Sequence, residues 1–89
     1  MDAKKEYIAN MANQLVAKNS KITGEDLAID LNSAGHKTYY NDTYAVGGRG
    51  VYTLVHATYD SLIKESRQPE ANNVANAFID ANGKPAWDK

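Results

Sequence analysis

The chain has 89 residues, of which 43% are hydrophobic, a net charge of −1 and no cysteine. This composition excludes an intrinsically disordered chain, and the lack of cysteine excludes disulfides, thiolate metal sites and cysteine nucleophiles. The apolar runs are too short to span a membrane, and the charged first residues do not resemble a secretory signal. We therefore expect one small, mainly α-helical domain (residues 1–89) that is cytoplasmic and contains four helices.

The first helix is predicted over about residues 3–18. Asp2 and Glu6 near its start and Lys18 near its end suit the helix dipole. Its apolar residues recur with the spacing of one buried helix face: Ile8, Met11, Ala12, Leu15 and Val16. We interpret this segment as a helix that packs against the rest of the domain.

The second helix is predicted over about residues 24–33. Thr23 is placed to cap its start, with Asp26 three residues later in the capping-box position. Gly35 is placed to end it in a left-handed conformation. The expected buried face contains Leu27, Ala28, Leu31 and Ala34. Ile29 points away from that face, toward another helix or a partner.

Residues 36–48 differ in character from the helices around them. Two short β-prone runs flank Asn41-Asp42, two residue types that tolerate the positive φ of a tight turn. A small β-hairpin and an extended loop both fit this pattern. The segment Gly47-Gly48-Arg49-Gly50 then allows the chain to change direction.

The third helix is predicted over about residues 50–66. Its central stripe comprises Val51, Leu54, Val55, Thr58, Tyr59 and Leu62. Tyr52, His56 and Ile63 lie beside this stripe and make the apolar and aromatic face wide. A face of this width indicates a helix that is central in the fold or shared with a second subunit.

The fourth helix is predicted over about residues 70–79, with Pro69 in its first turn. Its stripe comprises Ala71, Val74, Ala75 and Phe78. The tail, residues 84–89, contains Trp87, whose ring either folds back over the core or belongs to a terminal hairpin that pairs residues 78–81 with 84–87. Across the chain, the expected core residues include Leu15, Leu31, Leu54 and Phe78.

Catalytic and metal sites are not expected. Neither His36 nor His56 has a second ligand at a spacing typical of zinc sites, and Asp60 is placed only to pair with His56 across one helix turn. The Gly47–Gly50 segment lacks the spacing of a phosphate-binding P-loop. We therefore predict a protein that is not an enzyme and that uses no cofactor and no metal.

One segment suggests nucleic-acid binding. Residues 36–67 are the only third of the chain in which basic residues outnumber acidic ones. Within it, cations and aromatic rings alternate before a helix: His36, Lys37, Tyr39, Tyr40, Tyr44, Arg49 and Tyr52. Such groups can bind phosphates and stack on bases. The alternative is that the tyrosines cover a small core with their rings.

A resemblance favours the first interpretation. Residues 27–55 resemble a stretch of the recombinase domain of large serine recombinases, through Leu27-Ala28, Leu31-Asn32, Gly35, Thr38 and Tyr44. That resemblance implies a helix-turn-helix-like element that contacts DNA, in a protein of prokaryotic or phage type. It implies no recombinase activity, because the catalytic serine domain has no counterpart here.

Two functional hypotheses follow. The first is a small regulatory module of helix-turn-helix type that binds DNA through Lys37, Tyr39, Tyr40, Arg49, Tyr52 and Thr53. The second is a homodimeric protein-interaction module whose interface contains Ile29, Tyr52, His56 and Ile63. Neither hypothesis involves a membrane.

Overall fold

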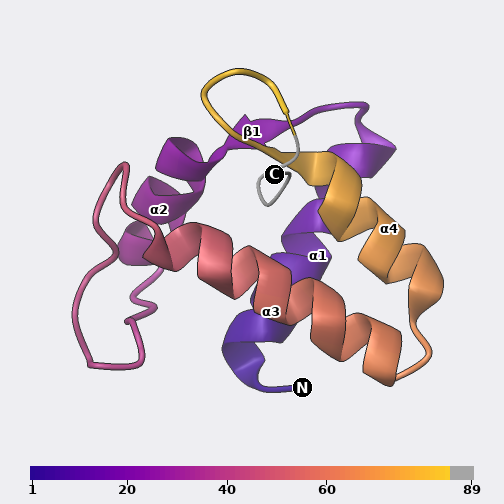
Figure 1. Cartoon of the computed structure of the whole chain (residues 1–89), viewed down its shortest axis with the longest axis horizontal. Helices are drawn as coiled ribbons and strands as arrows, with labels where there is room; N and C mark the ends of the chain where they lie inside the picture. Colours follow the sequence, from indigo (N-terminus) through magenta and orange to yellow (C-terminus); the bar gives the residue numbers. More distant parts are fainter. Residues whose placement is uncertain (85–89) are drawn as a thin grey trace.

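The computed structural model describes residues 1–84, which form four helices and two very short strands (Figure 1). The predicted mainly α-helical class is confirmed. In chain order the elements are α1 (Ala3–Ala17), β1 (Ile22–Thr23), α2 (Gly24–Ser33), α3 (Gly50–Lys64), α4 (Gln68–Ala77) and β2 (Phe78–Ile79). Helix α1 packs against α4 and α3, and α2 packs against α3. None of the helices in the described part is long and apolar enough to cross a membrane.

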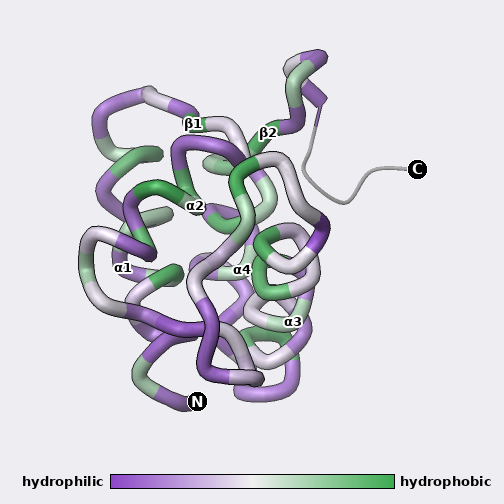
Figure 2. The backbone as a smooth tube through the Cα atoms, turned by 90° about the vertical axis from the view of Figure 1, so that its left-hand side faces the viewer, coloured by the Kyte–Doolittle hydropathy of each residue, from purple (hydrophilic) through white to green (hydrophobic). Residues whose placement is uncertain are grey.

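The core lies where the four helices meet. Figure 2 shows that the hydrophobic stretches lie mainly within the helices and strands, whereas the connections are largely hydrophilic. The fully buried large side chains come from every helix and from β2: Ile8, Leu27, Leu31, Val51, Val55, Thr58, Leu62, Val74 and Phe78. The hydroxyl of Thr58 donates a hydrogen bond to the Leu54 carbonyl at 2.8 Å, so its burial leaves no polar group unsatisfied.

The predicted core residues are confirmed in part. Leu31 and Phe78 are fully buried, whereas Leu15 and Leu54 are only partly buried and pack against the edge of the core. On α3 the buried row passes through Val55 and Leu62, and Leu54 lies on its flank. Ala34, expected on the buried face of α2, is exposed because it lies beyond the last helical residue.

The helix starts follow local chemistry. The Thr23 hydroxyl accepts a hydrogen bond from the Asp26 backbone N–H at 3.2 Å, which confirms the predicted cap. Asp2 caps α1 in the same way, accepting from the Lys5 N–H at 2.9 Å. Pro69 lies in the first turn of α4, as predicted. These contacts satisfy backbone donors that have no partner within the helix.

Three helices end in the same motif, in which a residue with positive φ follows the helix and the next backbone N–H binds a carbonyl of the last turn. At the end of α2, Gly35 adopts φ +83°, as its position predicted. Helices α1 and α3 end in the same way, but with Asn19 (φ +56°) and Ser66 (φ +59°) in the left-handed position. The bonds that close the three motifs run from His36 N to Leu31 O, Ser20 N to Leu15 O and Arg67 N to Leu62 O. Helix α3 therefore ends at Lys64, before the predicted boundary at residue 66.

The two strands connect segments that are far apart in sequence. β1 and β2 pair in parallel, with Ile22 opposite Phe78 and Thr23 opposite Ile79. This pairing turns Phe78 out of α4, which ends at Ala77 rather than near residue 79. A bond from the Asp80 N–H to the Lys84 carbonyl closes a turn after β2. The rest of the alternative terminal hairpin, including Trp87, lies outside the described residues.

Residues 36–48 form an extended loop, hereafter the 36–48 loop, and contain no strand. Its tip is a turn in which the Thr38 N–H donates to the Asp42 carbonyl at 2.7 Å. Asn41 has φ +65°, the conformation that Asn tolerates better than most residues. Of the two alternatives left open by the sequence, the loop is therefore the correct one.

Candidate nucleic-acid interface

Asn32 fixes the 36–48 loop to α2. Its side-chain Nδ2 donates to the Tyr44 carbonyl at 2.9 Å, and its Oδ1 accepts from the Tyr44 N–H at 2.7 Å. The Tyr44 residue is only 6% exposed and belongs to the core. Tyr44 is therefore an anchor of the loop, as the core-covering interpretation of the tyrosines expected, and is not available to a ligand.

Helix α1 holds the same loop from its other side. The ammonium group of Lys4 donates to the Lys37 carbonyl and lies 5.4 Å from the centroid of the Tyr44 ring. The Tyr44 hydroxyl also donates to the Lys37 carbonyl, at 3.3 Å. The backbone at Lys37 is thus fixed by two side chains, whereas the Lys37 side chain is exposed.

A polar cluster lies where α1, α2 and the loop meet. The Tyr7 hydroxyl donates to Asp30 at 2.5 Å, and this bond, with partial burial, raises the pKa of Tyr7 above its ordinary value. The Tyr7 ring packs on His36 with the centroids 4.5 Å apart. A shallow groove beside this cluster is lined by Tyr7, Asn10, Met11, Gln14 and Asp30. His36 is accordingly a packing residue between α1 and the loop.

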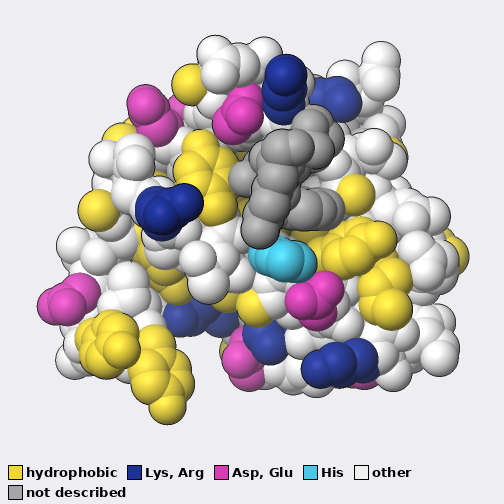
Figure 3. Space-filling view, in the orientation of Figure 1, with side chains coloured by type: hydrophobic (Ala, Val, Ile, Leu, Met, Phe, Trp, Pro, Cys, Tyr) yellow, Lys and Arg dark blue, Asp and Glu magenta, His cyan; other side chains and the backbone are white. Residues whose placement is uncertain are grey.

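Two tyrosines at the loop tip are almost fully exposed. Tyr39 is 95% exposed and Tyr40 is 83% exposed, with their rings edge to face and their centroids 5.8 Å apart. Figure 3 shows hydrophobic side chains that project from the lower left of the molecule, where Figure 1 places the turn of the loop. Because these exposed rings contribute nothing to the core, the pair is the clearest candidate contact among residues 1–84.

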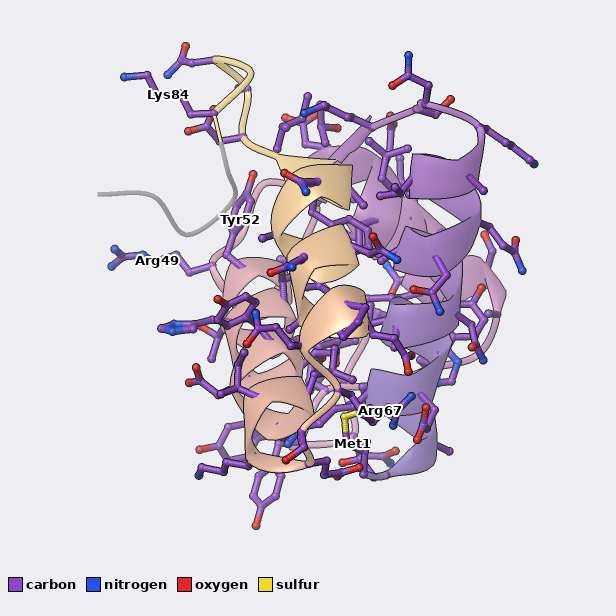
Figure 4. The ribbon with its side chains drawn as sticks, turned by 90° about the vertical axis from the view of Figure 1, so that its right-hand side faces the viewer. Met1, Arg49, Tyr52, Arg67 and Lys84 are labelled. Atoms are coloured by element: carbon purple, nitrogen blue, oxygen red, sulfur yellow. The ribbon has the colours of Figure 1, made fainter. Side chains whose placement is uncertain are left out.

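The remaining predicted contacts lie at the start of α3. The Arg49 side chain is exposed and points away from the helices (Figure 4). The exposed Thr53 hydroxyl donates to the Arg49 carbonyl at 3.2 Å. Arg49 directly precedes α3, whereas Tyr39 and Tyr40 lie in the turn at the tip of the loop. The structure thus divides the predicted site into a loop tip and a helix start.

Tyr52 serves a different purpose from the one predicted. It is partly buried, and a Cβ atom at Gly24 would lie only 2.4 Å from its ring carbon Cζ. The ring therefore packs directly on the first residue of α2, where only glycine leaves it room. This contact joins α3 to α2 and removes most of the ring from any nucleic-acid or subunit contact.

The predicted subunit-contact residues do not form one patch. Ile29 on α2 is 52% exposed and Ile63 on α3 is 38% exposed. Figure 1 places α2 beside the first turns of α3 and the last turn of α3 on the opposite side. His56 is exposed, and its Nε2 lies 3.5 Å from the Asp60 carboxylate, which confirms the predicted pairing. Tyr52 packs on α2, as described above.

An ion-pair network at the other end of the domain was not anticipated from the sequence. The Arg67 guanidinium makes a two-pronged contact with Glu6, at 2.9 and 3.0 Å, and also binds Glu70 at 2.8 Å. These hydrogen bonds lower the pKa of both glutamates. The amino group of Met1 binds Glu65, whose carboxylate also approaches Arg67 (Figure 4). Only the Arg67–Glu70 spacing across one helix turn was visible in the sequence.

Residues 1–84 contain no group of three or more His, Asp or Glu side chains that could hold a metal ion. Comparisons with protein families, curated proteins and solved structures found no match to this chain. The candidate contacts therefore rest on the structure alone: the exposed tyrosines at the loop tip and the exposed residues at the start of α3.

Proposed function

We propose that the protein is a small non-enzymatic regulatory module that binds nucleic acid through the 36–48 loop and the start of α3. The observation that carries this proposal is the exposed Tyr39–Tyr40 pair on a loop held by Asn32 and Lys4. Because the loop is already ordered, binding does not have to supply the free energy of ordering it.

The charges around the loop support a weak, salt-sensitive interaction. Lys37 and Arg49 are exposed, and Lys4 lies against the loop backbone, whereas Asp42 is the acid of the loop. These cations could neutralise roughly two or three phosphates per molecule. The resulting affinity is modest, because nonspecific affinity comes from the counterions that each neutralised phosphate releases. Functional affinity would then require a second copy or a second module that binds the same strand.

The resemblance to the recombinase domain supports this proposal through the order of its elements along the chain. A helix, a connection and a second helix follow one another in α2, residues 34–49 and α3. In helix-turn-helix proteins the turn is about three or four residues long. The connection here is much longer, so in this proposal the loop makes the principal contact and Arg49 and Thr53 contribute from the first turn of α3.

Fluorescence anisotropy with labelled duplex and single-stranded DNA tests the proposal. The variant Lys37→Ala/Arg49→Ala should bind more weakly and should flatten the slope of log affinity against log salt by about two units. The matched control is Lys18→Ala/Lys64→Ala, which removes two exposed lysines from the ends of α1 and α3. A wild-type protein that binds neither DNA at low salt, at tens of micromolar, would contradict nucleic-acid binding.

The second candidate function is a homodimeric interaction module. The exposed side chains of Ile29 and Ile63 favour it, because a self-complementary contact centred on either one would remove that side chain from water. Sedimentation equilibrium of the wild type and of Ile29→Lys and Ile63→Lys measures this. A protein that stays monomeric at high micromolar concentration excludes the dimer.

A further inference from the structure

We propose that the Tyr39–Tyr40 pair is a stacking platform for the unpaired bases of single-stranded nucleic acid. This inference rests on the proposed function and names its ligand class. The two rings meet edge to face, and both leave most of their surface open to solvent. An open aromatic face is what a splayed base requires, whereas the bases of a duplex are already stacked on one another.

The turn that carries the rings is held in place. The Thr38 hydroxyl accepts from the N–H groups of Tyr40 and Asp42, at 3.3 and 3.2 Å. A backbone bond from Asn41 to Thr38 at 2.9 Å closes the same turn. The rings are therefore presented by a backbone that is already ordered, which reduces the entropy lost when a base stacks on them.

One cation belongs to the same loop as the rings, and a second, from α1, is bound to the loop backbone. Lys37 is exposed two residues before Tyr39, and the Lys4 ammonium is bound at the Lys37 carbonyl. A strand whose bases stack on the rings would bring its phosphates past these groups, which is the combination found in nonspecific single-strand binding. Asp42 opposes them, so the stacking contacts must provide much of the affinity.

The two single-stranded probes differ in their bases but not in their number of phosphates, and a third probe has its bases paired. We would compare a fluorescein-labelled 12-mer of thymidylate with an abasic 12-mer of the same charge and with a 12-base-pair hairpin duplex. The wild type should bind the thymidylate probe more tightly than the abasic one, on the order of 10-fold, because stacking on a base contributes severalfold in affinity per ring.

Two double variants test the rings themselves, and a third variant is the control. Tyr39→Ala/Tyr40→Ala should abolish the preference for the thymidylate probe, whereas Tyr39→Phe/Tyr40→Phe should retain it because the rings remain. The control is Val46→Ala, which changes another exposed apolar side chain of the loop and should leave the preference unchanged. Circular dichroism should show the same fold for all three, since the altered side chains are exposed.

The outcomes separate this inference from the proposed function. Binding of all three probes with equal affinity, and no effect of the alanine pair, would overturn the stacking platform but leave nucleic-acid binding in place. A preference for the duplex that persists at physiological salt, where its higher charge contributes less, would also overturn it. If none of the probes binds, both proposals fail, and the exposed tyrosines then belong to a protein-contact surface.

Discussion

The two ends of this domain use their polar groups differently. Near the start of α4, Arg67 binds Glu6 and Glu70, so charged side chains are satisfied by one another. In the 36–48 loop, the side chains of Asn32 and Lys4 bind backbone groups instead. The first arrangement closes a helix junction. The second holds the backbone of a loop and leaves the rings of Tyr39 and Tyr40 exposed. A loop can therefore have an ordered backbone and exposed side chains when the anchoring hydrogen bonds are made to its backbone groups.

The largest expected effect contrasts the core with the loop tip. Leu62→Ala should lower the free energy of unfolding by about 2–5 kcal/mol, the usual range for a buried leucine. Tyr39→Ala/Tyr40→Ala should change it by less than about 0.5 kcal/mol, since both rings are exposed. Chemical denaturation of both variants measures the difference. A large loss of stability in the tyrosine variant would show that the rings pack on the protein.

The next effect concerns the anchor of the loop. Asn32→Ala should destabilise by about 1–3 kcal/mol, because it removes both hydrogen bonds to the Tyr44 backbone in a partly buried site. Asn32→Asp should also destabilise, because it keeps an acceptor for the Tyr44 N–H but places a carboxylate oxygen against the Tyr44 carbonyl in place of the donor. Asn76→Ala, on the exposed face of α4, is the control.

Amide hydrogen exchange shows where the Asn32 effect acts. Faster exchange in the 36–48 loop of Asn32→Ala, with α4 unchanged, would confirm a local anchor. Uniform loss of protection across all helices would instead make Asn32 a residue of the global fold, and the contrast between the two ends would not hold.

The ion-pair end should respond to acid. The pKa of Glu6 and of Glu70 is lowered from an ordinary value of 4.5, chiefly by hydrogen bonds from Arg67. Their contribution is therefore present above pH 4.5 and is lost as the pH falls through the lowered pKa values. We expect a smaller effect than that of Asn32→Ala, because these side chains are partly open to solvent.

Arg67→Gln isolates this contribution. Denaturation from pH 7 to pH 2 should show wild type more stable than Arg67→Gln at neutral pH and the two converging in acid. Arg49→Gln removes an exposed arginine outside the network and should follow the wild-type curve. A difference between wild type and Arg67→Gln that is constant with pH would contradict the role of the glutamates.

The smallest effect lies in the helix ends. Ser66 has φ +59°, a conformation that favours glycine, so Ser66→Gly should stabilise the fold by up to about 1 kcal/mol. Asn19→Gly should gain less, because asparagine tolerates φ +56° better than serine tolerates its own angle. Thermal unfolding measures both changes in stability. A less stable Ser66→Gly variant would show that the serine side chain stabilises the fold by more than its positive φ destabilises it.

Much of the helical framework was predictable because its signals are local. Thr23 caps α2, Gly35 ends it, and Pro69 begins α4, each through bonds or conformations within a few residues. The ends at Asn19 and Ser66 were not recognised, because these residue types adopt positive φ less often than glycine does. Helix boundaries were accordingly least accurate at residues 64–66 and 77–79.

The candidate site was predictable only as a segment. The pattern of tyrosines alone did not distinguish Tyr44, which is buried, from Tyr39 and Tyr40, which are exposed. That distinction depends on Asn32, twelve residues earlier, which binds the backbone of Tyr44 and directs its ring into the core. The same limit applies to Tyr52, whose burial depends on its contact with Gly24.

By itself, the sequence determined the helical class, the position of each helix and the composition of the loop, because periodicity and capping act over one or two turns. The tertiary structure decided which of those residues meet. The pairing of Ile22 with Phe78 and the contact of Arg67 with Glu6 join residues that are far apart along the chain. Such contacts are chosen by the packing of whole helices, and no local pattern records them.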